Sequence, residues 1–338
     1  MKWYINSGVD SDVVVSSRIR LARNLDELPF PNSMDRESSE KVIDAVRSAL
    51  EKYGNESFHY LDMEKVSRLE TSVLLEDHLV SREFCEQSGT HKMLITDETS
   101  NLAVMLNEED HIRIQTIYAG FAINEAYERA NAIDDCITKG VNLAFDETLG
   151  YLTSCPTNLG TGLRASVMLH LPAISASGYI KSLISLMTKI GLTVRGLYGE
   201  YSEAKGQLYQ LSNQVTLGIC EKDTLEKLTS AVLQIAAKER ELRKTLSLEE
   251  NISFQDKLWR SYGVLVSARK MTADEAAELI SNVRLGAQSG IIPALAEKNL
   301  IKLLIEIMPA HMIERNNEAS DSDIRDKLRA DYIREKMR

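Results

Sequence analysis

The pattern of apolar residues changes near residue 222, and this change constrains the fold more than any other feature of the chain. Before it, strand-like and helical patterns alternate. The expected strands are Val13–Leu21 and Leu102–Ile117, which are rich in β-branched residues and period-2 stretches, with Ala165–Leu171 as a third candidate. The expected helices are Glu37–Tyr53, Gly120–Ile133 and Ala176–Gly191. From Lys222 onward the pattern is almost wholly helical, so the sequence predicts an α+β body followed by a helical module.

Several signals mark helix ends in the C-terminal part. Thr272 and Glu275 form a capping box, in which each side chain satisfies the other residue's exposed backbone N–H group. Gly290 is the expected stop of the helix that follows. A further helix is expected over Pro293–Met308, and Ser322 is the expected cap of a last helix that runs to the C-terminus.

The length of 338 residues suits one large and one smaller domain, because a typical domain has about 150 residues. We place the boundary in the polar segment SLEENIS, so that residues 1–248 form the body and residues 249–338 form the helical domain. The net charge of −10 argues against a protein that coats nucleic acid, since such binding depends on an excess of Lys and Arg.

The sequence also indicates a cellular compartment. Its apolar runs fall short of the roughly 20 residues that a membrane span needs, and its N-terminus lacks the apolar region of a signal peptide. We therefore expect a cytoplasmic protein. The four cysteines are scattered without a C-x-x-C pair, which predicts reduced thiols and neither a disulfide framework nor a zinc site.

The first segment that bears on chemistry is SSRIRLAR, residues 16–23. If it is extended, Arg18 and Arg20 lie on one face, and Ile19 and Leu21 lie on the other. Two neighbouring guanidinium forks suit a polyphosphate, because each can hold two oxygens at once. A half-buried strand with a solvated basic face explains the same spacing.

A second segment is NEEDHIR, residues 107–113. In an extended conformation Glu109, His111 and Arg113 share one face, opposite two isoleucines. A carboxylate beside a phosphate-binding arginine is a reasonable active-site pair. A surface salt bridge is the open alternative.

Two glycine-rich segments follow, at Cys155–Met168 and at Arg195–Glu203. In the first, Gly160 and Gly162 allow a tight turn that delivers Arg164 to the start of a strand. The second, which also carries carboxylates, can equally be a plain hairpin or surface loop. Neither a Walker A sequence nor the H-R-D and D-F-G motifs of protein kinases occur in the chain. Nucleotide binding, if present, must therefore rest on arginines.

Together these segments resemble the phosphagen kinase superfamily, which includes arginine and creatine kinases. The motifs SSRIR, NEEDHIR and CPTNLGTGLRASV occur in the family's order, and the likeness spans roughly residues 13–215. The resemblance implies a catalytic domain with an antiparallel sheet flanked by helices.

Within that superfamily the chain is most similar to the bacterial protein-arginine kinases of the McsB type. Small-molecule phosphagen kinases have a helical domain, of typical small-domain size, before the S-x-R-x-R strand, whereas only 15 residues precede Ser16 here. Their usual R-G-T-R-G becomes Arg195-Gly-Leu-Tyr-Gly, with Tyr198 in place of an arginine. The chain also continues into a helical module. These departures imply an open site that admits an arginine side chain on a protein surface.

The resemblance implies ATP as the phosphoryl donor, with Mg²⁺ bridging phosphate oxygens and taking few ligands from the protein. The implied ATP-binding residues are Ser16, Ser17, Arg18, Ile19, Arg20, His78, Arg113, Arg164, Ala165, Ser166, Val167, Met168, Arg195, Gly196, Leu197, Tyr198, Gly199 and Glu200.

The implied catalytic residues are Glu109, Glu200 and Cys155. A guanidinium ion has a pKa above about 12 and no usable lone pair, so the two carboxylates are expected to orient it and to accept its proton. Cys155 occupies the place of the superfamily's substrate-side cysteine. Neighbouring arginines are expected to favour its thiolate.

The segment RDKLRA near the C-terminus resembles the phosphoarginine-binding motif of protein-arginine kinases. Arg325 and Arg329 are four residues apart, so both can face one anion on a helix, while Asp326 accepts from the ligand's guanidinium and Ala330 completes the motif. A solvated helix face is the alternative from spacing alone.

Two other functions fit parts of this pattern: a kinase of a free small guanidine, and a non-catalytic adaptor that reads phosphoarginine. The resemblance further implies a stress-response role with protein substrates that bear exposed arginine. Other implied partners are a zinc-type activator protein, a heat-shock repressor and a Clp-type ATPase. An apolar face of the helical module is expected to mediate a homodimer or a higher homo-oligomer.

Overall fold

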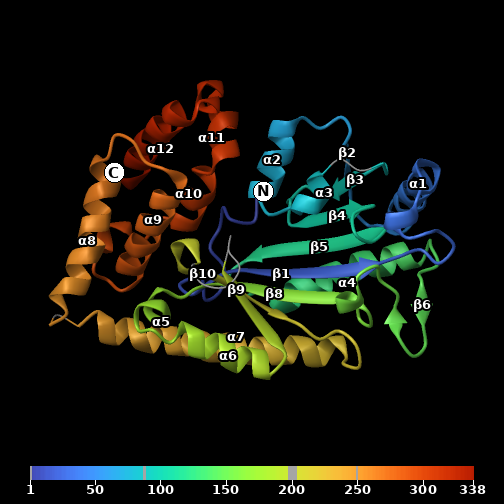
Figure 1. Cartoon of the computed structure of the whole chain (residues 1–338), viewed down its shortest axis with the longest axis horizontal. Coiled ribbons are helices and arrows are strands. Elements are labelled where there is room, and N and C mark those ends of the chain that lie inside the picture. The colour runs from blue at the N-terminus through green and yellow to red at the C-terminus, as the bar shows by residue number, and fades with distance from the viewer. Residues whose placement is uncertain (1, 87–88, 197–203, 249) are drawn as a thin grey trace. The chain divides into compact units, whose positions relative to one another are not determined.

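The computed structural model describes residues 2–86, 89–196, 204–248 and 250–338 (Figure 1). Its strands are β1 Val14–Arg23, β2 His59–Asp62, β3 Met93–Thr96, β4 Leu102–Leu106, β5 Ile112–Ala119, β6 Phe145–Asp146, β7 Gly150–Tyr151, β8 Leu163–His170, β9 Leu192–Gly196 and β10 Leu208–Asn213. Its α-helices are α1 Arg36–Tyr53, α2 Arg68–Glu76, α3 Arg82–Cys85, α4 Ile123–Thr138, α5 Pro172–Ala176, α6 Ile180–Lys189, α7 Glu221–Leu246, α8 Ile252–Ser267, α9 Ala273–Gln288, α10 Leu300–Glu306, α11 Pro309–Arg315 and α12 Ser322–Met337. Short 3₁₀ helices lie at Pro31–Ser33, Pro156–Asn158, Lys205–Gln207, Pro293–Leu295 and Asn317–Ser320.

Eight strands hydrogen-bond in the order β2-β3-β4-β5-β1-β8-β10-β9, and β6 and β7 form a separate hairpin. The pairs β2–β3, β3–β4, β4–β5 and β1–β5 are antiparallel. The predicted α+β class, with an antiparallel sheet, flanking helices and a C-terminal helical region, is confirmed. Within the described ranges, no helix combines the length and apolar character that a membrane crossing requires.

The chain forms two compact units. The first consists of Met1–Trp3, Ser16–Val167 and Ser212–Thr229, and the second of Tyr4–Val15, Met168–Leu211 and Ser230–Arg338. These units cut across the expected boundary at residue 248, which therefore stays a prediction.

Helices α1 and α4 supply much of the core of the first unit, where α1 packs on α4 and α4 packs on β5. The carboxylate of Asp35 caps α1 by accepting from the backbone N–H of Ser38. Val42 and Val46, one turn apart on α1, are fully buried. The fit is close enough that a Cβ on Gly140 would lie 2.5 Å from the Cβ of Ala49.

The segment Leu102–Ile117, expected to be extended, is a hairpin: β4 ends at Leu106 and β5 begins at Ile112. Between them the backbone N–H of Asn107 donates to the carbonyl of His111 at 2.9 Å. Asn107 has a φ of 64°, which a polar asparagine tolerates in a tight turn. The expected common face of residues 109, 111 and 113 is therefore wrong, because a turn breaks the period of two.

His111 is a core residue and does not join the arginines that are expected to bind phosphate. Its side chain is fully buried, its Nδ1 accepts from the backbone N–H of Leu25 at 3.0 Å, and its Nε2 lies 2.9 Å from the carbonyl of Pro29. Burial lowers the pKa of this imidazole, which favours its neutral form. Its two ring nitrogens hold the chain that follows β1 in place.

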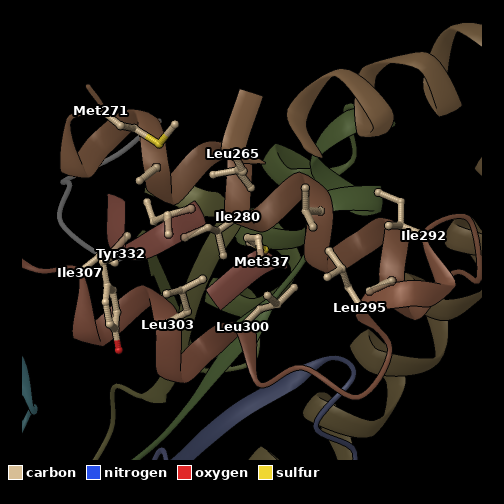
Figure 2. Packing of buried hydrophobic residues seen from close by; sticks show 14 of the residues in the cluster. Leu265, Met271, Ile280, Ile292, Leu295, Leu300, Leu303, Ile307, Tyr332 and Met337 are labelled. Atoms are coloured by element: carbon tan, nitrogen blue, oxygen red, sulfur yellow. The ribbon is translucent and has the colours of Figure 1, made fainter. Parts of the chain in front are cut away.

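The second unit is stabilised by an apolar cluster between helices, in which Leu265 of α8, Ile280 of α9 and Met337 of α12 point toward one another (Figure 2). The hydroxyl of Thr272 accepts from the N–H of Glu275, which is one half of the expected capping box; among the described hydrogen bonds, the Glu275 carboxylate does not return the second bond to Thr272. The expected single helix over Pro293–Met308 is wrong.

That stretch contains a 3₁₀ turn at Pro293–Leu295 and the separate helix α10, whose cap is Asn299. Asn299 favours a cap over a helix interior because its side chain competes for backbone N–H groups. The last helix begins at Ser322, but its cap is Asp321, which accepts from two backbone N–H groups.

Candidate active site

Four arginines from three neighbouring strands of the first unit form the basic part of the site. Arg18 and Arg20 lie on β1, Arg113 on β5 and Arg164 on β8, and these strands adjoin in the order β5-β1-β8. Along β1 the intervening Ile19 is fully buried, which confirms the predicted alternation. The β1–β5 register pairs residue 20 with 115 and residue 22 with 113, so Arg113 is the diagonal neighbour of Arg20.

Like charges in this cluster raise the free energy of the ligand-free site. Loss of hydration, followed by the charges of Arg113 and Arg164, lowers the pKa of Arg18 to about 10. The pKa of Arg20 is lowered well below its ordinary value by burial and by the other three arginines. Among the described residues, the Nε of Arg20 is buried without a hydrogen-bond partner. A polyphosphate would supply the missing acceptors and the missing negative charge.

Three of these arginines share a pocket of about 770 Å³ with several carboxylates of the same unit. The charged residues that line it are Arg20, Glu83, Glu86, Lys92, Glu108, Glu109, Asp110, Arg113 and Arg164. A basic set that suits phosphate thus adjoins an acidic set that suits a cationic acceptor.

Glu108 is the counter-charge of the basic set, a role that the sequence did not reveal. Both of its carboxylate oxygens accept from Nη1 of Arg113 at 2.6 Å, and one also accepts from the hydroxyl of Ser81 at 2.6 Å. Its side chain is only 3% exposed. Glu108 therefore holds Arg113 in place in the ligand-free site.

Glu109 and Cys155, both predicted to be catalytic, lie together. The thiol of Cys155 is near enough to the carboxylate of Glu109 to affect its pKa, and it lies 3.0 Å from the hydroxyl of Thr157. Glu109 is exposed, but partial loss of hydration, followed by the charges of Asp110 and Glu108, raises its pKa. A carboxylate with a raised pKa is a better proton acceptor than an ordinary glutamate.

The raised pKa gives a testable pH dependence. Because Glu109 can fill its expected role as proton acceptor only when ionised, kcat/KM for the expected phosphoryl transfer should fall, as the pH decreases, at a higher pH than the ordinary glutamate pKa of about 4.3. The measurement is the pH profile of kcat/KM, which reports groups of the free enzyme. An acid limb at the pKa of an ordinary glutamate would contradict this role.

Glycines bring the loop that carries Cys155 close to neighbouring backbone. Gly160 has a φ of 109°, and a Cβ there would lie 2.3 Å from the carbonyl oxygen of Thr216. Gly162 has a φ of 62°, and a Cβ there would lie 2.6 Å from the carbonyl oxygen of Ala22. Only glycine fits both positions, which explains the spacing seen in the sequence and aligns Arg164 beside β1.

His78 lies near the same cluster. It has a φ of 60°, and its pKa is lowered to about 4 by burial and by the charge of Arg18. The amide of Gln115 donates to the carbonyls of His78 and Leu79 at 2.8 and 3.1 Å, which ties this loop to β5. A neutral imidazole beside Arg18 fits the expected lining of a nucleotide site, and its role stays a prediction.

The other expected ATP-binding residues occupy three kinds of position. Ile19, Ala165 and Val167 have fully buried side chains on the sheet face opposite the arginines. They could therefore contact a nucleotide only through their backbone atoms. Two serines bond to the backbone: Ser17 donates to the carbonyl of Gly120, and Ser166 donates to the carbonyl of Arg18. Ser16 is buried. Met168, Arg195 and Gly196 belong to the second unit, and Leu197, Tyr198, Gly199 and Glu200 lie outside the described residues.

In the C-terminal motif RDKLRA, residues 325–330, one of the two arginines is bonded to the protein interior. Arg329 is 1% exposed and donates to the carbonyls of Ile307 and Met271 at 2.9 Å each, and it also pairs with Asp326. Arg325 is half-buried and donates to the carbonyl of Ala319 at 3.1 Å. Ala330, next to Arg329, is buried. Binding of phosphoarginine at this motif stays a prediction, with Arg325 as its more accessible cation.

Comparisons with known proteins agree with this geometry. Residues 41–242 match the ATP:guanido phosphotransferase, C-terminal catalytic domain family, and residues 251–338 match the Protein-arginine kinase McsB C-terminal domain family. A protein-arginine kinase of Syntrophomonas wolfei is 43% identical over 97% of this chain and 92% of its own length. One of Brevibacillus brevis is 44% identical over 99% of this chain and 95% of its own length. The chain belongs to the protein-arginine kinase family. As a member of that family it is a phosphotransferase.

Solved structures of other guanidino kinases share the fold of this protein-arginine kinase family member. Lombricine kinase superposes with a TM-score of 0.61 at 26% identity, over 70% of this chain and 69% of its own. The substrate-free duplicated taurocyamine kinase of Schistosoma mansoni gives a TM-score of 0.60 at 24% identity, over 82% of this chain and 41% of its own.

Proposed function

We propose that this chain transfers the γ-phosphoryl group of ATP to the guanidinium group of arginine side chains in proteins. The observation that carries the proposal is the shared pocket, in which Arg20, Arg113 and Arg164 adjoin Glu108, Glu109 and Asp110. One half suits a polyphosphate and the other suits a planar cation. The names of the similar protein-arginine kinases support the same acceptor.

The arginines bind the donor. Phosphoryl transfer depends mainly on positioning and on neutralising charge, and Arg18, Arg20, Arg113 and Arg164 provide both for the phosphate chain. When phosphate binds, Arg113 exchanges part of its contact with Glu108 for phosphate oxygens. The γ-phosphorus then breaks its bond to the bridging oxygen, which leaves as part of ADP.

The carboxylates bind the acceptor. Glu109 orients the guanidinium so that one nitrogen faces the γ-phosphorus in line with the leaving oxygen. As the N–P bond forms, that nitrogen becomes more acidic, and its proton passes to the Glu109 carboxylate. Glu200 is proposed as the second carboxylate. The thiol of Cys155, which is near enough to Glu109 to affect its pKa, completes the acceptor side.

Two carboxylates of the pocket already have other partners, so a bound Mg²⁺ ion would be held mostly by phosphate oxygens and water. Glu108 is occupied by Arg113 and Ser81, and Asp110 accepts from Asn24 and from the backbone of Ser154. Bound Mg²⁺ would neutralise phosphate charge, in keeping with its small demand for protein ligands.

The wider role is also proposed. Residues 1–248 act as the catalytic domain, and residues 249–338 bind phosphoarginine through Arg325, Asp326, Arg329 and Ala330 and mediate dimerisation. The product marks cytoplasmic proteins for Clp-type proteolysis and relieves a heat-shock repressor, with a zinc-type protein as activator. The match of residues 251–338 to a C-terminal domain of protein-arginine kinases supports this division.

The direct test is to incubate the purified protein with Mg-ATP and casein and to map phosphosites by mass spectrometry. Neutral work-up is needed because N–P bonds hydrolyse in acid. We expect phosphate on arginine, reduced by about 10²–10⁴-fold in Glu109→Ala. Glu147→Ala, an exposed glutamate of the same unit, is the matched control and should behave as the unmodified protein. Phosphate on free arginine but not on casein would replace the proposal with a small-guanidine kinase.

A further inference from the structure

Two separate loops bring Glu109 and Cys155 near one another. Glu109 lies in the turn between β4 and β5, whereas Cys155 follows β7 and precedes the 3₁₀ turn that begins at Pro156. Both belong to the first unit. A contact between two loops needs a fixed link to persist, since loops tolerate displacement more readily than strands.

Asp110 forms that link. Its Oδ1 accepts from the backbone N–H of Ser154 at 2.7 Å, one residue before Cys155, and from the side-chain amide of Asn24 at 2.7 Å. Asp110 itself directly follows Glu109, and it is 3% exposed. Asp110, the residue after Glu109, is therefore hydrogen-bonded to Ser154, the residue before Cys155.

Asn24 closes the arrangement from the end of β1. Its amide nitrogen also donates to the carbonyl of Leu152 at 3.0 Å, and its Oδ1 accepts from the backbone N–H of His111 at 2.8 Å. Asn24 is 1% exposed, so these bonds have little competition from water. Asn24 thus binds the loop before Cys155 on one side and the turn after Asp110 on the other.

We propose that Asp110 and Asn24 are positioning residues, whose shared hydrogen bonds hold the Glu109 turn against the Cys155 loop. The chemistry on which they act is that of the proposed function. Their main role is geometric: Asp110 accepts hydrogen bonds, while its charge has a smaller effect through the pKa of Glu109. Misplacing reacting groups by about 1 Å can cost 10²-fold in rate, so a link of this kind has a large effect on turnover.

The test compares Asp110→Ala, Asp110→Asn and Asn24→Ala. Alanine at 110 removes both bonds, whereas asparagine can present its Oδ1 to the same two donors. We expect Asp110→Ala to lower kcat by about 10²-fold with little change in the dissociation constant for ATP. Asp110→Asn should recover most of that loss. If Asp110→Asn is as inactive as Asp110→Ala, the charge is required and the proposal is wrong.

A second readout does not depend on turnover. The rate at which iodoacetamide alkylates Cys155, measured by peptide mass spectrometry, should rise in Asp110→Ala and in Asn24→Ala toward the rate in Glu109→Ala. Asp110→Asn should keep the rate of the unmodified protein. This result holds even if casein proves not to be a substrate, so it separates failure of this inference from failure of the proposed function. Unchanged alkylation in both alanine variants would overturn the inference, and Asn24→Ala decides the matter if Asp110→Ala does not fold.

Discussion

Replacement of Arg20 by methionine is expected to weaken ATP binding by about 10²-fold and to stabilise the nucleotide-free protein. Charge-assisted hydrogen bonds to phosphate contribute roughly 1.5–3 kcal/mol each, so the loss of one guanidinium fork suffices for this decrease in affinity. Without nucleotide, the same guanidinium is desolvated beside three other arginines, and its Nε has no hydrogen-bond partner among the described residues. Methionine fills similar space without a charge.

Both effects can be measured on the same samples. ATP affinity comes from titration calorimetry, and stability comes from thermal unfolding in nucleotide-free buffer. The matched control is Arg36→Met in the same unit, where Arg36 is exposed and pairs with Glu64 at 2.7 Å. It should change neither quantity by much, since exposed ion pairs contribute little. Reduced stability in Arg20→Met would show that Arg20 has a structural role, contrary to the electrostatic argument.

Periodicity in the sequence was sufficient to predict which side chains are buried where that depends only on neighbouring residues in the chain. The alternation of β1 follows from Arg18, Ile19 and Arg20 and needs no tertiary information. It failed at Asn107, because a polar turn between two apolar strands has no period of its own. It also failed over Pro293–Met308, where an internal Asn cap divides an otherwise helical pattern.

The site shows the same division. The arginines and Glu109 were recognisable because their motifs are compact in sequence. The links between them were not, since Asn24 meets Asp110 across 86 positions and Asp110 meets Ser154 across 44. Asp110 belongs to the recognised motif NEEDHIR, but its burial depends on partners that only the folded chain brings together. For the same reason the pairing of Arg329 with interior carbonyls was not foreseen, although its spacing from Arg325 was plain.

Replacement of Arg329 by alanine is expected to destabilise the second unit by about 3–5 kcal/mol. This is the typical cost of removing one partner of a buried ion pair, because Asp326 and the carbonyls of Ile307 and Met271 lose their donor. Urea unfolding followed by tryptophan fluorescence measures the effect, since Trp259 lies on α8 of the same unit. Lys327→Ala, an exposed position on the same helix, is the matched control and should be nearly neutral.

This expectation changes how phosphoarginine binding by the tail should be tested. Loss of binding in Arg329→Ala would follow from a weakened helical region whether or not Arg329 touches the ligand. Arg325→Ala leaves the interior bonds of Arg329 intact, so a selective loss of phosphoarginine affinity in that variant, at unchanged unfolding free energy, would assign the ligand to Arg325. If Arg329→Ala unfolds at the same urea concentration as the unmodified protein, the buried arginine is not structural, and its side chain becomes available as a second ligand-binding group.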